Sequence, residues 1–310
     1  MQSASLRFAA TQAGKRGLLA LGYYRHALGR VRFPGPVVLC YHGLRADHWP
    51  AGSMAFENLH VRASTFDDHC RVVRDTCDPI SLDDWRNAVA GRAPLPDRPV
   101  LITFDDGYRS VLTIGEPILR KHELPAVVFC CTEPAARRAL LWFDAVAASD
   151  GEDAVESWKG RSYGDWLPAC ASRTPTVADD DPRALLTPAE IGMLSRQEGI
   201  EIVAHTARHP ILAFASPAAQ RMEIQESRAA LETWTGRAVR AFAYPNGRPG
   251  LDYNATTTSI LDELGFDCSF TIHGTFALPG EPRLERSRIL VVSEVTAPEL
   301  AHRLAHSWTR

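Results

Sequence analysis

The sequence predicts an α/β protein in which parallel strands alternate with helices. Seven short apolar runs, rich in β-branched residues, occur along the 310-residue chain. Segments with helical periodicity separate most of these runs, which is the pattern of βα units. Polar side chains suited to chemistry follow directly after three of the runs. Seven units of this kind indicate a closed or nearly closed α/β barrel.

The elements are expected in the following order. The strands cover residues 36–41, 99–104, 125–130, 200–204, 240–244, 267–271 and 288–292. The helices cover residues 65–76, 81–90, 110–122, 188–198, 217–235, 255–265 and 296–306. Three helix starts carry N-cap signals, namely Ser64 or Thr65, the pair Ser81 and Asp84, and the run Thr187-Pro188-x-Glu190.

Residues 1–35 form a basic N-terminal segment with six Lys or Arg and no acid. Its apolar core, residues 17–24, is too short to span a bilayer. Arg25 and His26 follow that core, where a secretory signal would have a small-residue cleavage site. Two interpretations remain open: a helix packed against the outside of the domain, or a helix that touches an anionic membrane surface peripherally.

The stretch 141–187 interrupts the alternation of strands and helices. Residues 144–181 hold nine acidic residues against three basic ones, and Trp142, Trp158 and Trp166 lie in the same stretch. One interpretation is an insertion that acts as a lid or as a sugar-stacking wall over the mouth of the barrel. The other is a solvated acidic insertion that touches no ligand.

The net charge and the cysteines indicate which partners and which cellular compartment to expect. The formal net charge of −3 gives no basic footprint, so no nucleic-acid partner is expected. The seven cysteines are odd in number, form no C-x-x-C motif and fall partly in strand-like runs, which favours buried thiols over disulfides. We therefore expect the cytoplasm or the inner face of the membrane, with a periplasmic location less favoured. The sequence does not indicate the oligomeric state.

Two pairs of residues carry the strongest chemical signal. Asp105 and Asp106 follow one apolar run, and His205 and His209 follow another. In a barrel of parallel strands, the carboxyl ends of the strands meet at one mouth. Two imidazoles and one carboxylate can hold a catalytic divalent metal, and the second carboxylate is then free to move protons. Separately, the histidines could be structural, and the Asp-Asp-Gly run could be a simple turn.

Four runs occur in the order found in a known family. They are Val37-Val38-Leu39-Cys40-Tyr41-His42-Gly43, Thr103-Phe104-Asp105-Asp106-Gly107, His205-Thr206-x-x-His209-Pro210 and Phe242-Ala243-Tyr244-Pro245-Asn246-Gly247. Together they resemble the polysaccharide deacetylases (carbohydrate esterase family 4, the NodB-homology domain). The opening Tyr-His pair is similar to the poly-N-acetylglucosamine deacetylase branch. The resemblance runs from residue 36 to residue 293 and implies a distorted (β/α) barrel, with a catalytic domain over residues 36–310.

The resemblance also implies roles for individual residues. Asp106, His205 and His209 would ligate the metal, with zinc favoured by the donor set and cobalt or nickel as alternatives. Asp105 would be the general base that takes a proton from water. The backbone N–H of Tyr244 would hold the oxyanion of the reaction.

The general acid is the least defined of these roles. His42 is the candidate, with a buried structural histidine as the alternative and His273 as a poorer choice. Thr206 would orient a ligand or contact substrate, or would simply form a local turn.

Two features of the family pattern are missing. Many members carry an arginine in the third motif that braces the base, and only Arg240 stands near that position here, as a poor candidate. The late leucine-rich motif with a catalytic histidine is replaced by residues 286–291, as in the Tyr-His branch.

The implied function is metal-dependent removal of N-acetyl groups from amino sugars of a polysaccharide or its precursor. The partner would then be an acetylated glycan. Two alternatives stay open: an O-acetyl esterase that uses the same metal site, and a catalytically silent carbohydrate-binding relative. A non-haem iron oxygenase also uses two histidines and a carboxylate, but it gives no role to Asp105.

Overall fold

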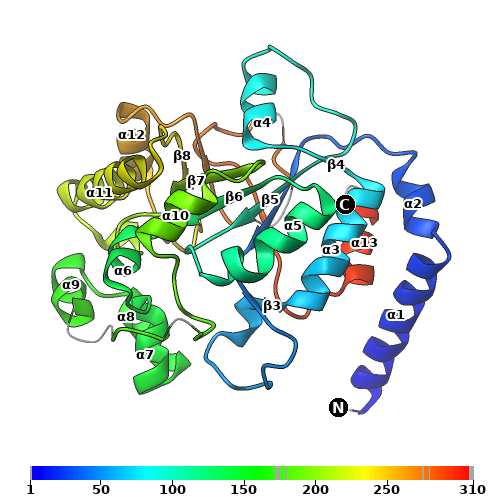
Figure 1. The fold of residues 1–310 in the computed structure, drawn as a ribbon, viewed down its shortest axis with the longest axis horizontal. Helices are drawn as coiled ribbons and strands as arrows, with labels where there is room; N and C mark the ends of the chain where they lie inside the picture. The colour runs from blue at the N-terminus through cyan, green and yellow to red at the C-terminus, as the bar shows by residue number, and fades with distance from the viewer. Residues whose placement is uncertain (1, 172–174, 179, 274–275, 279, 307–310) are drawn as a thin grey trace.

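The centre of the protein is a sheet of parallel strands, seen in a computed structural model that describes residues 2–171, 175–178, 180–273, 276–278 and 280–306 (Figure 1). The strands pair in the order β10-β1-β5-β6-β7-β8-β9, and β4 adds to β5. They are β1 (Val37–Tyr41), β4 (Asp78–Pro79), β5 (Pro99–Phe104), β6 (Ala126–Cys130), β7 (Ile200–Ala204), β8 (Ala241–Ala243), β9 (Cys268–Phe270) and β10 (Ile289–Leu290). All seven expected strands are confirmed, and the short β4 was not expected.

The two ends of this sheet nearly meet. Phe270 of β9 forms a parallel bridge with Arg286, which lies just before β10. Thr271 donates its N–H to the Arg286 carbonyl at 2.9 Å, and Arg286 donates to Ser269 at 2.9 Å. On its other side β10 pairs with β1. The predicted fold class, a distorted (β/α) barrel of about seven parallel strands, is therefore confirmed.

Helices cover the outside of the sheet close to where periodicity placed them. They are α3 (Ala63–Thr76), α4 (Leu82–Val89), α5 (Glu116–His122) with the preceding π-helical turn Val111–Gly115, α10 (Pro188–Leu194), α11 (Pro217–Thr235), α12 (Ala255–Glu263) and α13 (Ala297–His306). The capping boxes at Ser81 and Thr187 are confirmed. The expected cap of α3 is wrong, because the helix begins at Ala63, before Ser64 and Thr65.

A small second sheet was not expected. It pairs β2 (Gly43–Arg45) with β3 (His60–Arg62), and a short 3-10 turn, Glu57–Leu59, precedes β3. Another 3-10 turn covers Leu212–Phe214. Gly43 opposes His60 in the ladder, and a Cβ atom at Gly43 would lie 2.0 Å from Nδ1 of that ring. The glycine therefore makes room for the buried imidazole.

The N-terminal segment is helical and packs on the domain. It forms α1 (Gln2–Ala20) and α2 (Tyr23–Leu28), which lie beside α13 (Figure 1). The buried Tyr24 hydroxyl meets Nδ1 of His302 at 3.2 Å, and Lys15 pairs with Glu299. Among the described helices, none combines the length and the apolar character that a membrane crossing requires.

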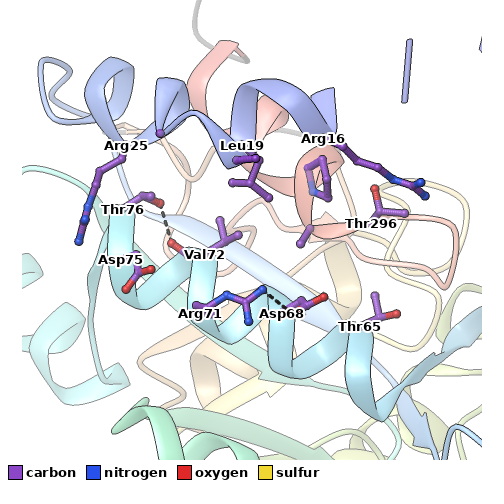
Figure 2. A pocket seen from close by; sticks show the side chains of 14 residues that line it. Arg16, Leu19, Arg25, Thr65, Asp68, Arg71, Val72, Asp75, Thr76 and Thr296 are labelled. Atoms are coloured by element: carbon purple, nitrogen blue, oxygen red, sulfur yellow. Dashed lines mark hydrogen bonds and ion pairs between the residues drawn. The ribbon is translucent and has the colours of Figure 1, made fainter. Parts of the chain in front are cut away.

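A groove of about 640 Å³ separates these N-terminal helices from α3 (Figure 2). Arg16 and Leu19 line its upper side, and Val72 and the ion-paired Asp68 and Arg71 line its floor. None of the residues expected to carry chemistry lines this groove. Size alone therefore does not identify the functional site.

The insertion forms compact helices. After α6 (Thr132–Arg137), it contributes α7 (Trp142–Asp150), α8 (Glu152–Lys159) and α9 (Tyr163–Ala171). The rings of Trp158 and Trp166 both pack against Trp142, and all three side chains are at most 4% exposed. These tryptophans form a small core, so the idea that they stack on sugars in a solvent-facing wall is wrong.

Candidate active site

Two strand ends bring the four strongest candidates together. Asp105 and Asp106 follow β5, whereas His205 and His209 follow β7, and each side chain is at most 6% exposed. Nε2 of His205 lies 3.4 Å from Oδ1 of Asp106, and Nε2 of His209 lies 3.3 Å from the same atom. One ligand atom from each of these three residues lies within 4.8 Å of the other two.

Hydrogen bonds around His205 orient its ring for metal binding. Its Nδ1 lies 2.8 Å from the Ala243 carbonyl oxygen, which can only accept a hydrogen bond, so Nδ1 carries the proton. In the neutral ring this leaves the Nε2 lone pair aimed at Asp106. A ring nitrogen fixed by a backbone carbonyl on its far side is the usual support for a metal-binding histidine.

The electrostatics of Asp106 also fit a cation. Both of its carboxylate oxygens are buried, and neither accepts a hydrogen bond that meets ordinary geometric limits. Burial raises the pKa of Asp106, but the adjacent His205 and His209 more than offset this and hold that pKa well below its usual range. A buried carboxylate whose oxygens accept no well-aligned hydrogen bond is costly unless a positive charge lies beside it. The three residues therefore fit a divalent metal.

Asp105 has a different partner. The guanidinium of Arg288 donates to both of its oxygens, Nη1 to Oδ1 at 2.6 Å and Nη2 to Oδ2 at 2.7 Å. Burial raises the pKa of Asp105, but the charge and hydrogen bonds of Arg288, together with the nearby His205 and His42, more than offset burial and hold that pKa below its usual range. Arg288 is fully buried, immediately before β10. Arg288 therefore holds the Asp105 carboxylate in place. The sequence suggested only Arg240 for this role.

Arg240 itself lies elsewhere. It lines a separate cavity near Trp85 and Cys268, beside β8 and β9. His273 is exposed and does not line the cavity that contains the metal ligands. Thr206 is buried, and its hydroxyl accepts the N–H of His209 at 2.9 Å, which fits the local-turn interpretation.

A cavity of about 80 Å³ opens beside Asp106, His205 and His209. His42 lines it together with Asp105 and Asp106, and the buried Nδ1 of His42 has no hydrogen-bond partner within the part of the chain that the structure describes. The rest of the wall is largely apolar and includes one lysine; these residues are Phe56, Leu59, Phe143, Val155, Lys159, Asn246 and Ile272. Phe143, Val155 and Lys159 come from the insertion, which therefore forms one wall of the cavity.

The geometry does not support the expected role of Tyr244. Its N–H donates to the Phe270 carbonyl at 3.2 Å within the sheet, and its hydroxyl donates to the Leu284 carbonyl at 2.7 Å. Its ring stacks on Tyr253 with centroids 3.7 Å apart. The residue of this turn that lines the cavity is Asn246, which has a positive φ of 59°.

The cysteines are all buried and free, as the sequence predicted. Cys40 lies nearest to the site, with Sγ 3.5 Å from Oδ2 of Asp105. Burial raises the pKa of its thiol well above the usual value, so Cys40 is neutral and packs as a small apolar side chain.

The sequence model of the polysaccharide deacetylase family matches residues 92–269, which is more than half of the chain. The chain therefore belongs to the polysaccharide deacetylase family. A segment of 70 residues is 39% identical to the poly-beta-1,6-N-acetyl-D-glucosamine N-deacetylase of Escherichia coli strain K12. That segment covers 22% of this chain and only 10% of the relative.

Solved structures support the fold over most of the chain. The deacetylase PplD of Streptococcus pyogenes, solved in complex with acetate, is 21% identical with a TM-score of 0.65, and the match covers 87% of this chain and 98% of that one. IcaB from Ammonifex degensii is also 21% identical with a TM-score of 0.62, and the match covers 89% and 99% of the two chains. At this level of identity the similarity establishes the fold.

Proposed function

We propose that the protein is a metal-dependent hydrolase that removes N-acetyl groups from amino sugars of a polysaccharide or its precursor. The observation that carries the proposal is that two adjacent carboxylates have different partners. Asp106 converges with His205 and His209 on one point, whereas Asp105 is held apart by Arg288. One carboxylate is thus suited to bind a metal and the other to accept a proton.

A divalent metal held by Asp106, His205 and His209 would make a bound water more acidic and polarise the amide carbonyl. Zinc suits a donor set of two imidazoles and one carboxylate, with cobalt or nickel as alternatives. The cavity is small and its wall is largely apolar, which strengthens electrostatic interactions inside it.

In the proposed reaction, Asp105 accepts the proton of the attacking water. Its ion pair with the buried Arg288 keeps the carboxylate ionised and fixes its orientation toward the cavity. The water oxygen forms a bond to the acetyl carbonyl carbon, and the bond from that carbon to the sugar nitrogen then breaks. His42, which lines the cavity, donates a proton to the departing amine, so that acetate and a free amino sugar result.

The oxyanion needs a donor other than Tyr244. In the turn that follows β8, the N–H groups of Tyr244 and Gly247 already have carbonyl acceptors, and Pro245 has no N–H. The remaining amide belongs to Asn246, which lines the cavity. We therefore assign the oxyanion contact to the Asn246 N–H.

The substrate is proposed from the sequence relative. The Escherichia coli protein is named as a deacetylase of β-1,6-linked poly-N-acetylglucosamine, so we propose this polymer, or its oligomers, as the first substrate to test.

The test is acetate release from β-1,6-linked N-acetylglucosamine oligomers by protein stripped of metal and then resupplied with zinc or cobalt. Release that depends on added metal supports the proposal. An O-acetylated glycan that is processed while the amide substrate is not would instead favour an esterase. Stoichiometric metal binding without release from either substrate would favour a silent binding protein.

A further inference from the structure

The loop that carries both histidine ligands is strained. Thr206 has a φ of +67° and His209 a φ of +62°, which is the left-handed region that non-glycine residues rarely adopt. For a β-branched residue such as Thr206 this conformation is especially unfavourable, and it persists only where the surroundings impose it. The contacts that impose it are therefore part of the metal site.

Two parts of the chain supply these contacts. Glu223 of α11 accepts the Arg208 N–H at 2.8 Å, and Tyr163 of the insertion donates to the same carboxylate at 2.6 Å. At the other end of the loop, the indole Nε1–H of Trp142 donates to the His209 carbonyl at 2.8 Å. The ring of Phe143 meets the His209 imidazole edge to face, with centroids 5.1 Å apart.

Among these hydrogen bonds, the one from Trp142 acts on a ligand residue itself. The Trp142 side chain is 3% exposed and stacks on the buried Trp158, so its N–H has a fixed direction. A donor with a fixed direction sets the orientation of the His209 peptide and, with it, the direction of the imidazole.

We propose that Trp142 is a positioning residue for the metal centre. Its indole N–H holds His209 in the strained conformation from which the imidazole can bind metal, so the insertion is a structural part of the metal site as well as a wall of the cavity. This inference rests on the metal centre in the proposed function, but it does not depend on which acyl group or glycan is processed.

The chain offers a matched control for this proposal. Trp166 belongs to the same buried cluster, and its Nε1 is buried with no hydrogen-bond partner among the described residues. Trp142→Phe and Trp166→Phe therefore remove similar amounts of apolar ring from the same core, but only the first removes a bond to the loop of metal ligands.

The experiment measures the zinc affinity of both variants by chelator competition and the visible absorption spectrum of the cobalt-loaded forms. We expect Trp142→Phe to lose zinc affinity by about 10–100-fold and to change the cobalt spectrum, the scale typical of removing support from a metal ligand. Trp166→Phe should match the wild type in both measurements. Equal zinc affinities for Trp142→Phe and the wild type, or equal losses in the two variants, would overturn the proposal.

If Trp142→Phe does not fold, 3-benzothienylalanine incorporated at position 142 keeps the ring shape and removes only the N–H. The same loss of zinc affinity is expected, and its absence would overturn the proposal. A wild-type protein that binds no divalent metal would refute both this inference and the proposed function. A protein that binds zinc and shows the Trp142 effect, but releases no acetate, would refute the proposed function alone.

Discussion

Asp105 and Asp106 are adjacent in the chain, yet their surroundings give them different chemistry. The peptide at Asp106 adopts a φ of +72°, which turns its carboxylate toward the two histidines. Asp105 instead meets the guanidinium of Arg288 through two short hydrogen bonds. At the scale of single residues, this difference in partners leads to two predictions.

The first concerns the proposed base. Asp105→Asn keeps the size of the side chain but cannot accept a proton from water. We expect the variant to bind metal in the same stoichiometry as the wild type and to lose turnover by about 10²–10⁴-fold. Metal analysis and acetate release on the same preparation check this, and Asp106→Asn, which should lose the metal, is the comparison. Wild-type turnover in metal-loaded Asp105→Asn would eliminate Asp105 as the base.

The second prediction concerns Arg288. Arg288→Lys keeps the positive charge but replaces two parallel hydrogen bonds with a single flexible contact. We expect Arg288→Lys to lose on the order of 100-fold in kcat, because the proposed base Asp105 is then misplaced. The zinc affinity should not change. Steady-state kinetics and zinc titration measure both quantities. Arg286→Lys is the control, because Arg286 lies two residues away and lines a different cavity. Equal kinetic losses in both variants would contradict this role for Arg288.

At the scale of elements, the sequence predicted the central strands well because they are buried on both faces. Their apolar runs are continuous and short. In both β1 and β6, all five residues are buried. It missed the pairing of β2 with β3, because three-residue strands leave no periodicity to detect. It also left the insertion open between a sugar-stacking wall and a solvated acidic segment, since composition does not reveal that the three tryptophans pack together.

The candidate site could be predicted from the sequence where its residues stand in short motifs. The two carboxylates and the two histidines stand in short motifs, and the structure brings them together. Arg288 was not predictable in this way, because it is 183 residues from Asp105 in the chain. The turn after β8 was placed correctly, but its cavity-lining residue is Asn246, because sheet pairing occupies the N–H of Tyr244.

The ladder between β2 and β3 allows a prediction at this scale. Gly43→Ala would place a Cβ atom 2.0 Å from Nδ1 of the buried His60, so the imidazole or the ladder must move. We expect a loss of about 1–3 kcal/mol in the free energy of unfolding, measured by urea denaturation.

A second substitution tests the cause of this loss. In Gly43→Ala/His60→Ala the added methyl group has room, so the double variant should lose less than the sum of the two single variants. Gly164→Ala is the control, because no atom lies within 4 Å of a Cβ built there. Strict additivity would show that the crowding between Gly43 and His60 is not the cause.

At the scale of the whole molecule, one buried acid affects stability across the neutral pH range. Asp144 is fully buried, accepts a hydrogen bond from the Tyr108 hydroxyl at 2.8 Å, and has one oxygen without a partner. Burial raises the pKa of Asp144 from its usual value of 3.8 to about 7. Between these two values the folded protein binds more protons than the unfolded chain, so stability falls as the pH rises toward 7.

Asp144→Asn removes this dependence, because an amide does not titrate. Relative to the variant, the wild type should therefore lose about 3 kcal/mol of unfolding free energy between pH 5 and pH 8. Urea denaturation of metal-free protein at the two pH values measures the difference. Asp153→Asn, at an exposed position on α8, should show no such trend. A constant difference between wild type and Asp144→Asn would show that Asp144 is ionised throughout this range.

The near-closure of the barrel has a consequence for how the chain matures. During synthesis, β5 and β7 leave the ribosome long before β10, whose residue Ile289 pairs with Leu39 in β1. Until this late, distant pairing forms, Asp105 lacks its guanidinium partner, and burying it alone would be costly. Pairings between distant segments also form slowly. The last strand of the sheet therefore completes the barrel and neutralises the buried carboxylate in the same step, so a partly folded chain has the proposed metal ligands but lacks an ordered Asp105, the proposed base.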